Sequence, residues 1–455
     1  MALVGTTLSV LLLLVTATGV GIAARRALFS APARDLGLSV SALVGLCFMA
    51  AVMPNLFLLG LPRHAVLGGI YCVAGFGWFR WGKRELDNVD RRAAMDAGLL
   101  ALALASPIVI AATRPPIFND AVLIWWPKVV EVARGEWPYV GQATLAHVNP
   151  GYPRGMAWLT NAASPASIPD PQLMQMVSLL WTWLTAVAMV ATGRMLGGGR
   201  SALLVALLFV LLPDVARHAC SGMSDLAIAG AVLLASIGLT MRRTHPEGFV
   251  IAGVAAIGAH SMKEEGAVVS LVVGAFFVFD LWRRPANRLR TLRGIALFPI
   301  LVPFWLVRSS SPQTRMTTLS TLLNDPEVLF LRCVAVVEHM FRFVMAPDSV
   351  AFAGEGVAIV AVSWAGFFVL VSLVLLIPRP WPRPMLATPA VLMLPAAALA
   401  YITTGIGIRW HISTTIDRLM IELVPTMALA GFLRMAPGTE TATLTPTTAC
   451  APRVP

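Results

Sequence analysis

The chain has 455 residues, of which 57% are hydrophobic and 13% are charged, and its formal net charge is +11. Its mean hydropathy of +0.77 excludes an ordinary soluble globular protein. The positive charge does not indicate a nucleic-acid partner, because the basic residues lie in short segments between apolar runs, where they orient a membrane protein. The composition therefore predicts an all-α, polytopic integral membrane protein.

Apolar runs that reach or approach the ~20 residues needed to cross a bilayer recur along the chain. The first run has no basic residue before it and Arg25 and Arg26 after it, the reverse of a secretory signal, so we expect a first transmembrane helix with its N-terminus outside. Counting the runs predicts about 13 spans, at residues 3–23, 38–60, 65–79, 97–113, 173–192, 201–215, 226–241, 248–260, 267–282, 294–307, 357–377, 385–401 and 419–433.

The basic clusters alternate with these spans, so all of them fall on one side of the membrane, which should be the cytoplasm. The opposite side then carries two long loops, 114–171 and 308–355, and loops of that length in a compact protein are usually functional. The basic clusters are Arg25, Arg26 and Arg34; Arg80, Lys83, Arg84, Arg91 and Arg92; Arg194 and Arg200; Arg242 and Arg243; Arg283, Arg284, Arg288, Arg290 and Arg293; Arg379 and Arg383; and Arg434.

We expect one transmembrane domain over residues 1–435, followed by a disordered, Thr- and Pro-rich cytoplasmic tail at 436–455. The five cysteines show no paired spacing, so no disulfide framework is expected, and Cys220 with Cys333 is the only pair worth testing.

Residues 121–134 in the first outer loop have the pattern of a helix that lies in the membrane interface. The two tryptophans there are interfacial anchors first and a substrate wall second. The apolar face of this helix consists of Val122, Trp125, Trp126, Val129 and Val130. The charged face consists of Lys128, Glu131 and Arg134.

Polar residues gather at the outer ends of the predicted helices, and this convergence is the main functional signal in the sequence. Ionisable groups at membrane depth are costly, so they rarely occur there without a partner or a function. The groups are Asn119 and Asp120; His147, Asn149, Tyr152 and Arg154; Ser221 and Asp225; Lys263, Glu264 and Glu265; and Arg409, His411, Asp417 and Arg418.

Several charged residues also have a simpler, structural explanation. Glu422 follows Arg418 by four residues, so an intrahelical ion pair is as good an interpretation as a functional role. Lys263 could have no role beyond an ion pair with Glu264 or Glu265. Local pairs are also expected for Asp280 with Arg283 and Arg284, Asp214 with Arg217, and Glu338 with Arg342. No HxxH or HExxH spacing occurs, so interfacial positions are favoured over metal ligation for His218, His339 and His411.

The order of these motifs resembles the GT-C superfamily of membrane glycosyltransferases, which includes protein O-mannosyltransferases and aminoarabinose transferases. The resemblance runs from about Pro115 to Pro425, and residues 1–94 precede it as extra N-terminal helices. The chain departs from the usual pattern at Asn119, Arg154 and Glu264. Because of these departures, the resemblance does not indicate whether a metal is required or which sugar is transferred. The matching elements are Asp120 with Trp125 to Lys128; His147 with Tyr152 and Pro153; Ser221 to Asp225; Lys263, Glu265 and Gly266; and Arg418, Leu419 and Pro425.

The resemblance implies a hexosyl- or pentosyltransferase of the inner (plasma) membrane. The sequence has neither a Gly-rich phosphate loop nor an Asp-x-Asp pair for a nucleotide sugar. The expected partners are therefore a polyprenyl-phosphate-linked sugar, membrane lipid, and a glycan, lipid or protein acceptor on the extracytoplasmic side. No cofactor is certain, and a divalent cation is left open. Two alternatives remain: a transporter or flippase for a lipid-linked or anionic solute, and an O-antigen ligase-like enzyme.

In the implied inverting reaction Asp120 is the base that takes the acceptor proton. Cations would stabilise the donor phosphate, namely Lys263, Arg418 and Arg154. Support for the substrates would come from Asn119, Lys128, His147, Tyr152, Asp225, Glu264 and Glu265.

Overall fold

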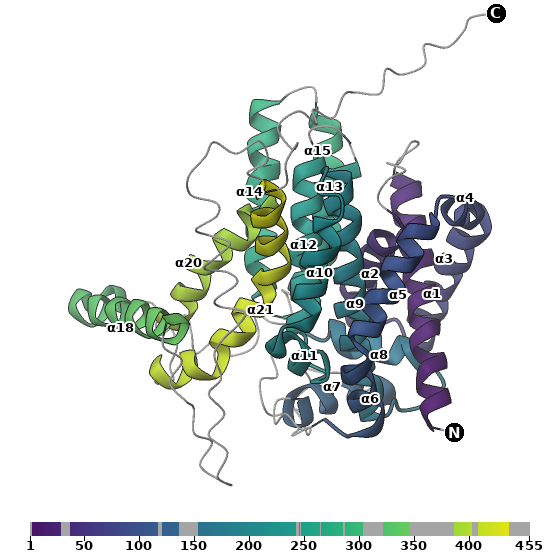
Figure 1. Ribbon diagram of the computed structural model, residues 1–455, viewed down its shortest axis with the longest axis horizontal. Coiled ribbons are helices and arrows are strands. Elements are labelled where there is room, and N and C mark those ends of the chain that lie inside the picture. Colours follow the sequence, from purple (N-terminus) through teal and green to yellow (C-terminus); the bar gives the residue numbers. More distant parts are fainter. Residues whose placement is uncertain are drawn as a thin grey trace, which may run out of the picture.

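The computed structural model describes residues 2–28, 37–116, 121–135, 153–242, 245, 247–263, 265–284, 287–303, 322–345, 386–402 and 408–435. Within these residues the fold is helical and contains no strand (Figure 1). The predicted all-α class is confirmed.

The N-terminal half contains short helices packed around long ones. In chain order its elements are α1 (Ala2–Leu28), α2 (Gly37–Leu58), α3 (Arg63–Gly77), η2 (Trp78–Gly82), α4 (Lys83–Leu86), α5 (Arg91–Ala103), α6 (Ala105–Thr113), η3 (Ala121–Trp125), α7 (Trp126–Arg134), α8 (Gly155–Ala163) and α9 (Pro171–Met195).

The second half continues the bundle with α10 (Ser201–Leu211), α11 (Pro213–Ala219), α12 (Asp225–Met241), α13 (Glu247–Met262), α14 (Gly266–Arg283), α15 (Arg288–Ile295), η5 (Phe298–Leu301), α18 (Pro326–Met345), α20 (Thr388–Ile402) and α21 (Ile408–Met435). Helices α12 and α13 are buried on almost every side, which explains why they are apolar all round.

Four helices of the described chain, α1, α2, α9 and α14, are long and apolar enough to cross a membrane. The number rises to six if each of two bent pairs is one span: α5 with α6, bent by 55°, and α10 with α11, bent by 67°. Prolines Pro107 and Pro213 lie at the starts of α6 and α11, where a missing backbone N–H and a steric clash favour a break. The described residues thus support four to six spans, and the predicted span 357–377 lies outside them.

The helix ends gather at two opposite ends of the bundle (Figure 1). The basic end contains the C-terminal ends of α1, α9, α12 and α14, together with α15. The site end contains α7, α8, α11 and the first turns of α12 and α14. Ion pairs tie neighbouring helices at the basic end: Arg25 with Glu247, Arg26 with Glu85, Arg194 with Asp96, and Arg242 with Asp280.

Two of the local ion pairs predicted from spacing are present. The nearest nitrogen–oxygen distances are 4.0 Å for Arg217 with Asp214 and 3.6 Å for Arg284 with Asp280. Asp280 also accepts from Arg242 at 2.6 Å, and Arg242 directly follows another helix, α12. The side chain of Arg342 lies outside the described residues, so its pair with Glu338 stays a prediction.

The cysteine pair singled out from the sequence is not bonded. Cys220 and Cys333 are both free thiols, as are Cys47 and Cys72. Cys450 lies outside the described residues.

The helix predicted at 121–134 exists as η3 and α7, but the predicted exposure of its charged face is wrong. Lys128 and Glu131 are buried, with 0% and 4% of their surfaces exposed. Glu131 forms an ion pair with Arg154, which directly precedes α8, and the ammonium of Lys128 lies 5.2 Å from the ring centroid of Trp125. The helix packs against α8 and turns these charges toward partners inside the protein.

Candidate functional site

The turn before α12 is shaped by its own side chains. Ser221 Oγ donates to the carbonyl of His218 at 2.6 Å and accepts from the backbone N–H of Met223 at 3.1 Å. Gly222 has a φ of +73°, in the left-handed region that favours glycine. This small-residue turn sets Asp225 in the first turn of α12, where the helix dipole favours a carboxylate.

The turn between α13 and α14 explains the Lys-x-Glu-Gly pattern. The backbone folds back so sharply that a Cβ on Gly266 would lie 2.0 Å from the carbonyl oxygen of Ala259. The N–H of Gly266 donates to the carbonyl of Lys263 at 3.1 Å and closes the turn. Only glycine, which has no Cβ, fits at residue 266. The turn directs the side chain of Lys263 into the protein, and 7% of that residue is exposed.

Lys263 is the centre of a cluster that joins three distant parts of the chain. Its Nζ donates to Asp225 Oδ1 at 2.7 Å and to Glu422 Oε1 at 2.7 Å, and lies 3.5 Å from Glu265 Oε1. His218 Nδ1 lies 3.3 Å from Asp225 Oδ2. We call these five residues the Lys263 cluster. A further cation, Arg418 on α21, acts electrostatically on Asp225.

Lys263 remains a cation in this setting. Burial opposes its charged form, but the carboxylates of Asp225, Glu265 and Glu422 outweigh burial and raise the pKa of Lys263, in the turn outside both helices, well above its ordinary value.

The cluster has hydrogen-bonding capacity that its own members do not use. An ammonium has three donors, and two of those of Lys263 make short bonds. Within the described part of the chain, Ser224 Oγ, Glu265 Oε2 and Glu422 Oε2 are buried and have no hydrogen-bond partner. Buried polar atoms are normally satisfied by protein, water or a ligand, so this region is equipped to hold a polar ligand.

The structure brings together four of the predicted site residues, Asp225, Lys263, Glu265 and Arg418. Arg154 and Lys128 are placed in the neighbouring buried contacts of α7 with α8, and α8 packs against α13. The other predicted site residues lie outside the described residues: Asn119, Asp120, His147, Tyr152 and Glu264.

Two residues of the cluster were not assigned to it from the sequence. His218, expected at the interface, contacts Asp225 across the Ser221 turn, which reverses the chain. Glu422, expected as a partner of Arg418, accepts a hydrogen bond from Lys263. The i, i+4 spacing puts Glu422 on the same helix face as Arg418, so it could have indicated that Glu422 lies near the site.

Among the described residues, no group of three or more His, Cys, Asp or Glu side chains could hold a metal ion. Comparisons with models of protein families, with curated proteins and with solved structures find no match for this chain. The functional inference therefore rests on the residues of the site and on the order of the motifs.

Proposed function

We propose that this protein is a membrane glycosyltransferase that moves a sugar from a polyprenyl-phosphate donor to an extracytoplasmic acceptor. In this proposal the chain has a GT-C-like fold with about 13 spans, of which residues 1–94 are additional to the shared core. The observation that carries the proposal is that Asp225 and Lys263 are bonded in one buried cluster and that Arg418 acts electrostatically on Asp225, although the three residues belong to separate motifs.

The distribution of charge supports an extracytoplasmic site. The arginine-rich helix ends lie at the basic end, opposite α7, α8 and α11 (Figure 1). Basic residues favour the cytoplasmic side, so the Lys263 cluster would face the other side of the plasma membrane. A donor there has to be carried by a lipid, because nucleotide sugars are cytoplasmic substrates and the sequence has no motif to bind one.

The proposed chemistry is a single displacement with inversion. Asp120 accepts the proton of the acceptor hydroxyl while the hydroxyl oxygen forms a bond to the anomeric carbon of the donor sugar. The bond from that carbon to the phosphate oxygen breaks, and polyprenyl phosphate leaves with the electron pair. The third donor of Lys263, with Arg418 and Arg154, would stabilise the leaving phosphate, since cations act most strongly where water is scarce.

The remaining predicted residues would support the substrates. Glu265 and Asp225 hold the ammonium of Lys263 in place. Lys128 is fixed beside Trp125, on the helix that begins directly after Asp120. Roles in shaping the donor and acceptor sites are proposed for Asn119, His147, Tyr152 and Glu264.

A transporter of a lipid-linked or anionic solute is the second candidate. The observation that favours it is the pair of broken helices, α5 with α6 and α10 with α11. Transporters often bind their solutes at such breaks, near the middle of the membrane. Most of the Lys263 cluster lies instead at helix ends, with Glu422 alone inside a helix, which favours the transferase.

Sugar transfer by the purified protein in liposomes, with a panel of polyprenyl-phosphate sugars, tests the proposal. We expect transfer from at least one donor, and a loss on the order of 10² or more with Asp120→Asn, which keeps the size of the residue and removes its basicity. The matched control is Asp170→Asn, which changes an exposed carboxylate in the same outer loop and should leave transfer unchanged. Lipid movement without sugar transfer would establish the transporter instead.

The sidedness is tested by labelling cysteines in intact cells with an impermeant maleimide. A cysteine at Gly141, in the outer loop, should be labelled, and one at Asn287, which begins α15 at the basic end, should be protected. The opposite pattern would place the Lys263 cluster in the cytoplasm and remove the basis for a lipid-linked donor.

A further inference from the structure

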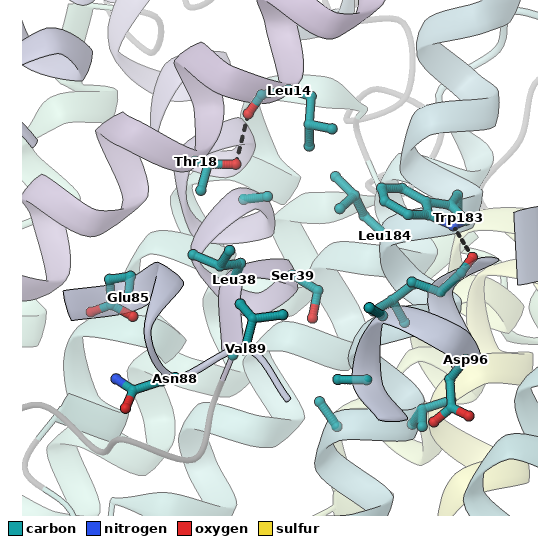
Figure 2. Close-up of a pocket in the computed structure, with 18 of the residues that line it drawn as sticks. Leu14, Thr18, Leu38, Ser39, Glu85, Asn88, Val89, Asp96, Trp183 and Leu184 are labelled. Carbon is teal, nitrogen blue, oxygen red and sulfur yellow. Dashed lines mark hydrogen bonds between the residues drawn. The ribbon is translucent and has the colours of Figure 1, made fainter. Parts of the chain in front are cut away.

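A pocket of about 400 Å³ lies beside the basic end, between α1, α2, α5 and α9 (Figure 2). Its volume is within the range of small-molecule sites. Most of its lining is apolar and includes Leu14, Leu38, Val89, Leu184, Val187 and Val190.

The polar groups in the apolar wall are satisfied within the protein. Trp183 Nε1 donates to the carbonyl of Ala97 at 3.0 Å, and Trp78 Nε1 donates to that of Val15 at 2.8 Å. Thr18 Oγ likewise donates to its own helix, to the carbonyl of Leu14, at 2.7 Å. Water in a cavity needs two or more polar partners, so this part of the pocket suits a hydrocarbon chain better than water.

The charged groups lie on two flanks of the pocket. Figure 2 shows Glu85 and Asn88 at the left and Asp96 at the right of the view, all of them below Leu14. Glu85 is paired with Arg26 and Asp96 with Arg194, so the charges balance. The side chain of Arg194 lines the pocket, and 21% of its surface is exposed.

This distribution favours a ligand with both signs of charge. A phosphate oxygen could accept from the exposed part of the Arg194 guanidinium, while an ammonium could approach the carboxylate of Asp96 or that of Glu85. An anionic headgroup without an amine would place its charge beside two carboxylates whose cations are already paired. A polyprenyl phosphate is also a poor fit, because it has no amine to approach these carboxylates.

We propose that this pocket binds one acyl chain of a phospholipid with an amine headgroup, with the phosphate on Arg194. The site is distinct from the Lys263 cluster and does not depend on the proposed sugar transfer. The bound lipid would fill the space between α1, α5 and α9 at the basic end.

Native mass spectrometry of delipidated protein, reloaded with single lipids, tests the proposal. The probes are phosphatidylethanolamine, phosphatidylglycerol with the same acyl chains, and a polyprenyl phosphate. We expect one phosphatidylethanolamine to bind at a concentration about tenfold lower than phosphatidylglycerol needs. Equal or tighter binding of phosphatidylglycerol would overturn the headgroup assignment, and preference for polyprenyl phosphate would overturn the proposal.

Filling the pocket provides the second arm of the test. Ala97→Trp puts a large side chain into the pocket from α5, and Val187→Trp does so from α9. Both should abolish the tight binding of phosphatidylethanolamine. Leu102→Trp is the matched control, because Leu102 lies on α5 with 71% of its surface exposed. Thermal unfolding identifies the folded variants, and tight binding retained by either folded pocket variant would contradict the assignment.

Discussion

The two ends of the bundle use buried charge differently. At the basic end each buried carboxylate has at least one arginine partner on another element, and these pairs tie helices together. At the site end one buried lysine faces Asp225, Glu265 and Glu422, and two of these carboxylates leave an oxygen without a partner in the described chain. The carboxylates of the basic end are accounted for by their arginines, whereas those of the site end have hydrogen-bonding capacity left for a ligand.

The largest effect on stability is expected when the cation of the site end is removed. Lys263→Ala leaves Asp225 and Glu422 buried beside each other without their ammonium, and loss of one partner of a buried ion pair costs about 3 to 5 kcal/mol. Chemical unfolding in detergent measures the loss. Adding Asp225→Asn and Glu422→Gln should recover part of it, and a loss below about 1 kcal/mol would show that these carboxylates do not depend on Lys263.

A smaller effect is expected from the matching change at the basic end. Arg242→Ala removes the 2.6 Å contact with Asp280, but Arg284 remains 3.6 Å from that carboxylate. We expect a loss of about 2 to 3 kcal/mol, which Asp280→Asn alone should largely reverse. Sugar transfer by the folded fraction should be unchanged. Loss of transfer without loss of stability would mean that the basic end also serves the reaction.

The turn that carries Lys263 should be sensitive to one added methyl group. Gly266→Ala overlaps the backbone of Ala259, and such overpacking typically costs about 1 to 3 kcal/mol. Gly274→Ala on the same helix is the control, since an added Cβ would meet nothing within 4 Å there. It should be neutral or slightly stabilising because alanine favours helix. Equal thermal stability of the two variants would contradict the described turn.

The smallest effect is expected for the rate at which maleimide labels Cys220. This native thiol lies in the turn between α11 and α12. Burial raises the pKa of Cys220 to about 11. Only the thiolate reacts, so roughly a thousandth of this thiol is reactive at pH 8, and the fraction rises about tenfold per pH unit toward that pKa. With the other cysteines replaced by alanine, maleimide labelling should be slow at pH 8. Rapid labelling would mean that the Ser221 turn is open.

The helices could be predicted from the sequence because apolar runs and their charged boundaries are local patterns. Asp225, Lys263, Glu265 and Arg418 were recognisable for the same reason, since each stands at the end of an apolar run. The contact of Lys263 with Glu422 spans 159 residues, and no local pattern specifies it. The bends before α6 and α11 were missed because hydropathy reads a broken helix as a continuous one.

Lys128 and Glu131 show that an amphipathic pattern does not predict whether the charged face of a helix lies against water or against the protein. The spacing correctly predicts a helix with one charged face, but a charged face can turn toward a partner as well as toward water. The partner of Glu131, Arg154, lies 23 residues away, beyond a single helix. Only tertiary packing decides between the two orientations.

The most direct test compares the two ends in one experiment, through the affinity of the purified protein for a polyprenyl phosphate and its thermal stability. We predict that folded Lys263→Ala binds about tenfold or more weakly than the unsubstituted protein, and that folded Arg242→Ala binds normally although it is less stable. Lys263→Arg should retain part of the affinity, because it keeps the charge but not the compact ammonium. Unchanged affinity in folded Lys263→Ala, with only its stability reduced, would show that the Lys263 cluster is as purely structural as the ion pairs of the basic end.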